Sequence, residues 1–248
     1  MVLPQARLAQ VTVPGRELPW ARHCILAAAI AIASITLSQA HAAGGHHAVD
    51  DAALLDPGQC EIETWIERQR DRGDGGSRLL HAGAGCRVGR VELGLGADRS
   101  RASGGENPGR VSAQLKWATA LDARWSVGVV LSGQWASARN GGYQGAALLV
   151  PVSWKLDDSV TVHLNAGRDF GRDLPSASRA GVAVEWAPMV DRSFMAERFR
   201  QDGVDAWRLA ARWLPMPGLS VDVGRAAGGG TAPLWTVGLN WAFEPSAR

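Results

Sequence analysis

Apolar and polar residues alternate along most of this chain, and residues 234–243 show the alternation most clearly. The apolar positions of this stretch are Trp235, Val237, Leu239, Trp241 and Phe243, and the positions between them are small or polar. Strict alternation is typical of a β-strand with one apolar and one polar face. The aromatic residues stand at both ends of the apolar face. The stretch therefore predicts a strand whose apolar face is aliphatic in the middle and aromatic at its ends.

The same period-two pattern predicts twelve strands after residue 58. They span residues 60–69, 78–88, 90–99, 110–120, 124–136, 145–155, 158–168, 178–187, 191–200, 204–214, 218–225 and 234–243. The stretch 191–200 is the weakest, because it carries charge on both parities. Short connections such as 121–124 alternate with longer loops such as 99–109. Short turns on one rim and longer loops on the other are typical of outer-membrane β-barrels, whose turns face the periplasm.

Tryptophan positions indicate which face is buried. Alternation alone also fits a soluble β-protein, because a soluble core would bury the same aliphatic residues but would hold its tryptophans in the middle of strands. Two groups of tryptophans at strand ends instead match the two interfaces of a membrane. The pattern therefore predicts an all-β, antiparallel, up-and-down transmembrane barrel of about twelve strands. The periplasmic group is Trp117, Trp125, Trp154, Trp186, Trp213 and Trp241, and the outer group is Trp135, Trp207 and Trp235.

Residues 1–42 have the features of a secretory signal peptide. Three arginines precede an apolar run at 24–37, and Ala40-His41-Ala42 offers a cleavage site. An uncleaved anchor is the less favoured alternative, since the run is short. This leader holds three Arg and one Glu, so the net charge of +2 falls to zero after cleavage and gives no argument for nucleic-acid binding. We expect a signal peptide (1–42), an N-terminal periplasmic segment (43–58), a barrel (59–243) in the outer membrane and a C-terminal tail (244–248).

Two cysteines, Cys60 and Cys86, remain after the predicted cleavage. Export to an oxidising compartment favours a disulfide over two free thiols. A hairpin that turns near residue 73 places residue 60 opposite residue 86, and it also pairs Ile62 with Ala84 on matching faces. We therefore predict a cross-strand disulfide between the first two strands.

The polar parity of the strands, which would face the barrel interior, carries both signs of charge among Ser, Thr, Asn and Gly. Inward charges need partners or water. Two interpretations stay open: a salt-bridge network that fills the barrel, and a hydrated conduit lined by opposed charges. The predicted lumen-lining residues are Glu61, Glu63, Trp65, Glu67, Glu92, Asp98, Lys116, Lys155, His163, Arg179, Glu185, Arg208, Arg212 and Asp222.

A group of potential metal ligands lies just after the predicted cleavage site: His46, His47, Asp50 and Asp51. Imidazole and carboxylate groups four residues apart would share one face of a helical turn, and such donors suit a transition metal. The alternative is a solvated polar leader that eases export or covers the periplasmic mouth of the barrel. We expect no other cofactor.

Signals of enzymatic activity are poor. The chain has no His-x-Ser pair of the kind that outer-membrane phospholipases carry, and no nucleotide-binding fingerprint. His163 is expected to be a hydrogen-bonded lumen residue. An outer-membrane hydrolase is therefore the least favoured class, and we expect no catalytic residues.

The signal, the strand meander, the aromatic girdles and the last strand ending at Phe243 resemble those of small Gram-negative outer-membrane barrels. The chain looks most like the transporter-like group that includes the phenol-degradation (MetA-pathway) barrel proteins. In such barrels the assembly machinery recognises the aromatic end of the last strand, here Trp241 and Phe243, although five residues follow Phe243 in this chain. The resemblance implies a conduit for small solutes in the outer-membrane bilayer. A filled structural or binding barrel with an N-terminal metal segment is the alternative.

Overall fold

The computed structural model describes residues 46–70, 76–102, 105–106, 109–137, 142–172, 175–201, 203–229 and 232–245. The predicted signal peptide lies outside these residues, as does most of the predicted tail. Among the residues described, no helix is long and apolar enough to cross a membrane.

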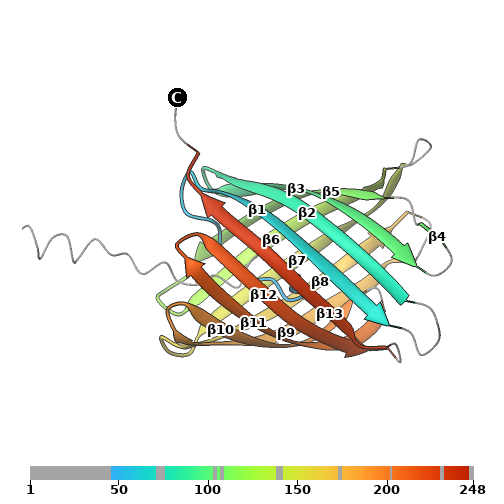
Figure 1. Ribbon diagram of the computed structural model, residues 1–248. Coiled ribbons are helices and arrows are strands. Elements are labelled where there is room, and N and C mark those ends of the chain that lie inside the picture. Colours follow the sequence, from blue (N-terminus) through green and yellow to red (C-terminus); the bar gives the residue numbers. More distant parts are fainter. Residues whose placement is uncertain are drawn as a thin grey trace, which may run out of the picture. The chain divides into compact units, whose positions relative to one another are not determined.

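The described chain forms one antiparallel sheet that closes into a barrel (Figure 1). Neighbouring strands pair in sequence order, and β1 closes the ring by pairing with β13 on one side and β2 on the other. The strands are β1 (Cys60–Arg70), β2 (Gly76–Val88), β3 (Val91–Ala102), β4 (Gly105–Glu106), β5 (Arg110–Ala120), β6 (Trp125–Ala136), β7 (Tyr143–Lys155), β8 (Val160–Gly171), β9 (Ala177–Met189), β10 (Arg192–Gln201), β11 (Val204–Met216), β12 (Leu219–Gly228) and β13 (Leu234–Phe243).

The predicted fold class is confirmed, because all twelve predicted strands are present and their bounds agree within three residues. The additional strand, β4, has two residues, pairs with the end of β3 and is too short to produce a period-two pattern. The weakly predicted stretch 191–200 forms β10. Charged residues occur on both parities of this strand, because Glu197 is buried inside the barrel while Arg198, on the other parity, is exposed.

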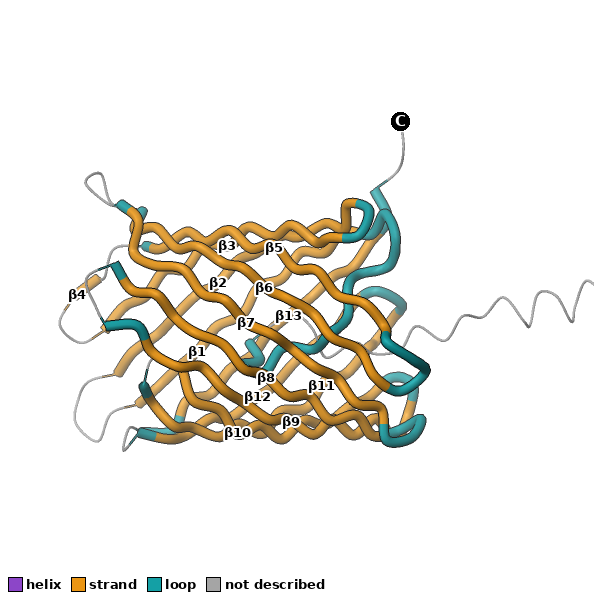
Figure 2. Tube along the Cα trace, turned by 180° about the vertical axis from the view of Figure 1, so that it is seen from behind, coloured by secondary structure: helices purple, strands orange, loops and turns teal. Residues whose placement is uncertain are grey.

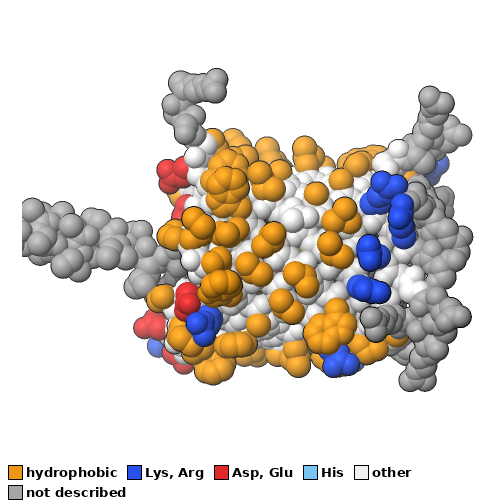
Figure 3. Space-filling model, in the orientation of Figure 1, with side chains coloured by type: hydrophobic (Ala, Val, Ile, Leu, Met, Phe, Trp, Pro, Cys, Tyr) orange, Lys and Arg blue, Asp and Glu red, His pale blue; other side chains and the backbone are white. Residues whose placement is uncertain are grey.

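The outward parity of the strands is apolar and exposed. Leu95 is 70% exposed and Val237 54% exposed, whereas residues of this kind fill the core of a soluble protein. Trp186 and Trp241 are exposed near the short turns, and Trp235 is exposed near the longer loops. Apolar side chains spread over the barrel wall, while charged side chains gather at its two ends (Figure 3). An exterior of this kind is suited to lipid rather than to water, as in transmembrane barrels.

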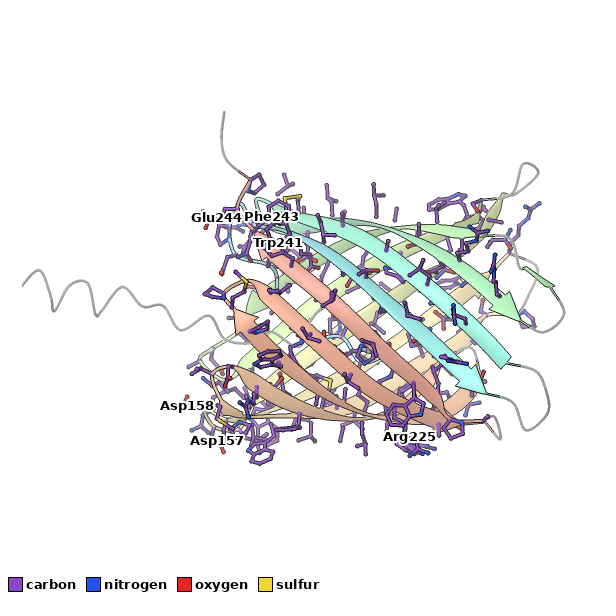
Figure 4. The ribbon with its side chains drawn as sticks, viewed as in Figure 1. Asp157, Asp158, Arg225, Trp241, Phe243 and Glu244 are labelled. Carbon is purple, nitrogen blue, oxygen red and sulfur yellow. A yellow bond between two sulfur atoms is a disulfide. The ribbon has the colours of Figure 1, made fainter. Side chains whose placement is uncertain are left out.

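The two ends of the barrel differ in their charged residues. Asp157, Asp158 and Glu244 lie at the same end as Trp241, whereas Arg225 lies toward the opposite end (Figure 4). The first end carries the short turns and the C-terminal end of β13, and it therefore corresponds to the periplasmic rim of outer-membrane barrels. The end with the longer loops corresponds to the outer rim.

Aspartates shape two of the short turns. Asp122 accepts hydrogen bonds from the backbone N–H groups of Arg124 (2.7 Å) and Trp125 (2.8 Å), and Asp157 accepts them in the same way from Ser159 and Val160. The N–H groups of Arg124 and Trp125 lower the pKa of the Asp122 carboxyl from its usual value. Because the ionised form is favoured in the folded turn, this contribution to stability is present above the ordinary aspartate pKa and is lost as the pH falls through the lowered one.

β1 is tied to both of its neighbours at the periplasmic rim. Cys60 lies opposite Phe243 of β13 and opposite Cys86 of β2. A disulfide joins Cys60 to Cys86, which confirms the predicted bond. The predicted register is confirmed as well, since Ile62 lies opposite Ala84.

Replacing both cysteines with serine should leave the barrel folded but lower its free energy of unfolding by about 2–4 kcal/mol, the usual effect of removing a disulfide that closes a loop of this size. The bond spans 26 residues of sequence. Denaturant unfolding of the exported chain in detergent micelles, followed by tryptophan fluorescence, measures the difference. Wild-type protein kept in reductant is the control and should match the C60S/C86S variant; wild-type protein that unfolds at the same denaturant concentration with and without reductant would contradict the prediction.

Candidate functional site in the barrel lumen

The side chains predicted to line the lumen lie on the inward parity of the strands, and most of them are buried or partly buried. Lys155 is also partly buried, but it lies at the periplasmic rim with its Nζ 3.0 Å from the exposed carboxylate of Asp158. The buried members are Lys116, His163, Glu185, Arg208, Arg212 and Asp222, and the partly buried ones are Glu61, Glu63, Trp65, Glu67, Glu92, Asp98 and Arg179.

Residues 46–59, hereafter the plug segment, lie inside the barrel, where a loop trace runs through the interior (Figure 2). We expected residues 43–58 to form a periplasmic segment; their described part, from His46, occupies the lumen instead. Val49 and Ala52 are 1% and 3% exposed. The segment contains no helix and ends at the periplasmic rim, where Pro57 and Gly58 turn the chain into β1. Gly58 has a φ of 81°, a conformation that favours glycine.

Lys116 of β5 is the central anchor of the plug segment. Its side chain is 2% exposed, and its Nζ lies 2.9 Å from an oxygen of Asp50 and 2.9 Å from an oxygen of Asp51. Glu92 lies opposite Lys116 on the neighbouring strand β3. A buried ammonium is costly unless anions and hydrogen bonds surround it. The two plug aspartates therefore supply the charge that allows Lys116 to be buried, and Lys116 in turn fixes the plug.

Glu197 of β10 anchors the deeper part of the plug segment. Its Oε1 accepts a hydrogen bond from the backbone N–H of Val49 at 3.0 Å and lies 3.7 Å from Nδ1 of His47. The Val49 side chain packs against Ala183 and Met195 in a small apolar cluster inside the barrel. Polar and apolar contacts together hold this part of the plug against the wall.

Gly224 of β12 allows a close approach of the plug segment to the opposite wall. A Cβ atom at this position would collide with the imidazole of His46. His46 stacks on His47 with the ring centroids 4.6 Å apart. The plug thus contacts β5, β10 and β12 and spans the lumen instead of lining one side of it.

Ser153 and His163 form a hydrogen-bonded pair behind the plug segment. Ser153 Oγ lies 2.8 Å from His163 Nδ1, and Glu185 lies 3.6 Å from the other nitrogen of that imidazole. Ser153 Oγ also accepts a hydrogen bond from the backbone N–H of Ala52 at 2.9 Å. A serine, a histidine and a carboxylate in this arrangement are the residue types of a catalytic relay. The serine oxygen, however, is buried and hydrogen-bonded to the plug. In this state the three residues hold the plug.

Contacts at the periplasmic rim complete the attachment of the plug segment. The N–H of Leu55 donates to Glu92 at 3.1 Å, and Arg87 donates to the carbonyl of Leu55 at 2.7 Å. Arg87 lies one residue after Cys86, so the disulfide fixes the strand that carries this contact. The plug is therefore held at both ends and in the middle.

Other lumen charges are paired within the wall. Arg212 and Asp222 face each other across β11 and β12 and form two hydrogen bonds, at 2.6 and 3.2 Å. His81 lies 2.6 Å from Asp98 and 3.4 Å from Glu63. The His81 ring also stacks on Trp65 with the centroids 3.6 Å apart. These pairs join neighbouring strands of the wall.

Two cavities border the plug segment, and another is lined by wall residues toward the longer loops. The first, of about 250 Å³, lies against the wall formed by β1, β2, β3, β5, β6 and β7 and is lined by Glu61, Glu63 and Glu92. The second, of about 430 Å³, lies beside His46 and Glu67, and the third, of about 400 Å³, opens beside Arg110 and Asp169. The first two cavities share Trp65, the first and third share Arg179, and the second and third share Gln201. Each cavity therefore has a lining residue in common with each of the other two.

The predicted metal ligands are brought into the lumen but not into one metal site. Asp50 and Asp51 bind Lys116, and His47 lies beside Glu197. Within the described ranges there is no group of three or more His, Cys, Asp or Glu side chains that could hold a metal ion. The segment has bends and no helical turn here, so the i to i+4 pairing is not formed.

Several plug contacts could not be predicted from the sequence, because their partners are far apart in the chain. Glu197 and Ser153 lie 148 and 101 residues from the plug positions that they bind. The inward parity of β7 and β10 would have placed both residues in the lumen. Nothing in the local sequence indicates that the plug would meet them there.

Substituting Lys116 with methionine should release the plug segment, because Asp50 and Asp51 would lose their buried cation. Leaving one partner of such a pair buried costs about 3–5 kcal/mol. A V49C variant reports the release: its thiol should be protected in the parent and should react with a water-soluble maleimide after K116M is added.

The matched control is K155M, since Lys155 pairs with a fully exposed aspartate at the rim and such pairs contribute about 1 kcal/mol or less. A K116M barrel in which the thiol at position 49 stays protected would show that Lys116 does not hold the plug.

The fold is shared with known porins of low sequence identity. KdgM porin in complex with disordered oligogalacturonate is 13% identical, with a TM-score of 0.58 over 74% of this chain and 99% of that chain. NanC porin is 10% identical, with a TM-score of 0.54 over 73% of this chain and 98% of that one. No curated protein matches the chain. The structural likeness supports a porin-like barrel fold.

The comparisons do not confirm the predicted resemblance to the phenol-degradation barrel group. Residues 31–243 instead match another family along almost the whole chain. By that match, the chain belongs to the family described as uncharacterised conserved protein UCP029691.

Proposed function

We propose that the protein is an outer-membrane conduit for small solutes whose lumen is narrowed by the plug segment. The observation that carries the proposal is a set of three cavities with common lining residues, two of them between the plug and the wall and the third lined by the wall alone. The first cavity reaches Glu61 and Glu92, which lie near the periplasmic rim, and the other two extend toward the longer loops. A small hydrated solute could follow this course without crossing the apolar cluster around Val49.

The charges along this course favour small cations. Glu61, Glu63 and Glu92 line the cavity nearest the periplasm together with Asp50 of the plug, and these four carboxylates outnumber the basic Lys116 and Arg179 that also line it. Rings of carboxylates select cations in channels. The outer cavities mix signs, with Arg208 beside Glu67 and Arg179 beside Asp169. The acidic stretch is therefore the part of the course that would discriminate by charge.

Conductance of the purified barrel in planar lipid bilayers tests the proposal. We expect small channels with a reversal potential that shows cation preference in a salt gradient. Removal of residues 46–56 should raise the conductance severalfold, because the plug would no longer occupy the lumen. Silent membranes with both forms of the barrel would refute a conduit.

Two matched sets of variants test whether the carboxylates of this cavity determine the cation selectivity. Replacing the three carboxylates by E61Q/E63Q/E92Q should reduce the cation preference. The control D157N/D158N/E244Q removes the same amount of charge from the exterior of the periplasmic rim and should change selectivity little. An unchanged cation preference in the E61Q/E63Q/E92Q variant would show that these three carboxylates do not determine the selectivity.

A filled structural barrel is the second candidate. The observation that favours it is the density of plug contacts: Lys116, Glu197 and Ser153 each bind the plug from a different strand. In that case the wild-type barrel would be silent and only the form without residues 46–56 would conduct. The same bilayer measurement therefore separates the two candidates.

We also propose that the aromatic end of β13 directs insertion by the barrel-assembly machinery. Trp241 is 54% exposed on the lipid face, and its ring lies 5.2 Å from that of Phe243. Phe243 is the last residue of the strand that closes against β1.

The F243D variant should fail to reach the heat-modifiable, folded form in cells, whereas F243Y should be inserted normally because it keeps an aromatic side chain. Abundance of the folded band in outer-membrane fractions is the measurement. Normal insertion of F243D would remove the assembly role of this residue.

A further inference from the structure

Four arginines and one tryptophan form a continuous row on the outward face of the barrel. The strand register places Arg225 of β12 opposite Trp235 of β13, Trp235 opposite Arg68 of β1, Arg68 opposite Arg78 of β2, and Arg78 opposite Arg101 of β3. All four arginines are exposed. Each step is a direct cross-strand pair, so these residues, hereafter the arginine row, follow one another over five strands.

The arginine row places like charges side by side. Directly opposed like charges on neighbouring strands destabilise a sheet. In the part of the chain that the structure describes, the guanidinium groups of Arg68 and Arg78 make no hydrogen bond or ion pair with another residue. An anion from outside the protein would relieve the repulsion between these two guanidinium groups.

The arginine row lies at the level where lipid headgroups meet the barrel. On β1, Arg68 follows Ile62 and Ile66 on the same outward parity, and both isoleucines are about half exposed on the lipid face. The guanidinium of Arg225 lies 5.3 Å from the ring centroid of Trp235. Exposed tryptophans mark the interface between lipid tails and headgroups. The row therefore begins at this interface and continues toward the longer loops.

Basic side chains are most numerous on this face toward one end of the barrel. Figure 3 shows most of them near the end with β4, while at the opposite end a few stand among acidic side chains. Asp157, Asp158 and Glu244 belong to that opposite end, and Arg225 to the basic one (Figure 4). The leaflet that meets the longer loops therefore faces a mainly positive surface, whereas the periplasmic leaflet faces a mixture of acidic and basic side chains.

We propose that the arginine row binds the phosphorylated headgroups of glycolipid in the outer leaflet of the outer membrane. Guanidinium groups recognise phosphate through paired hydrogen bonds, and a row of them suits a headgroup that carries more than one phosphate. The row faces outward, so a solute in the lumen does not meet it. The proposal is independent of whether the barrel conducts.

Native mass spectrometry of the folded barrel in detergent, titrated with bisphosphorylated lipid A or with the same lipid after removal of both phosphates, tests this assignment. The wild-type barrel should retain the phosphorylated form and bind the dephosphorylated form much more weakly. The R68Q/R78Q variant should bind the phosphorylated form about 30-fold more weakly, because each basic residue beside an anionic membrane surface contributes about a factor of five.

The matched control is R90Q/R124Q, which removes two exposed arginines from the periplasmic turns and should bind like the wild type. Equal binding of the two lipids by the wild-type barrel would overturn the proposal even if a variant failed to fold. Inorganic phosphate that displaces the lipid at comparable concentration would overturn it too, since the row would then be a site for the free anion.

Discussion

A lipid bilayer offers no hydrogen bonds, so every backbone N–H and C=O group of the membrane-spanning wall has to be satisfied by another strand. The pairing of β1 with β13 meets this requirement, because without it the sheet would expose two unpaired edges to lipid. Closure also fixes the two environments of the side chains. One parity faces lipid and is aliphatic with aromatic ends, and the other faces the lumen and carries almost all the buried charge.

Closure creates a second constraint, because a barrel of this size encloses space that water or side chains must fill. The lumen solves this in two ways. Arg212 with Asp222, and His81 with Asp98, are satisfied within the wall. Lys116 and Glu197 are satisfied by the plug segment. The wall and the plug are therefore complementary in charge. The cavities that remain are the parts of the lumen that the side chains of the wall and the plug do not fill.

The strands, their order, the inward set of charges and the disulfide could be predicted from the sequence, because each depends on period-two alternation or on a local hairpin. The position of the plug could not. His46 to Asp51 look like a polar leader or a metal cluster when read locally, and their partners Lys116, Ser153 and Glu197 lie on three different strands. Only the curvature of the closed sheet brings those side chains together around one short segment. The strand β4 was missed for a different reason, since two residues carry no periodicity.

The position of the plug has a consequence for the order of assembly. Its contacts join residues separated by 101 and 148 positions in the chain, and β10 and β12 contribute to them. No intermediate that lacks the C-terminal half of the wall can offer the complete binding surface. Docking of the plug segment is therefore a late event that requires the complete wall. A docked plug indicates that the barrel around it has closed.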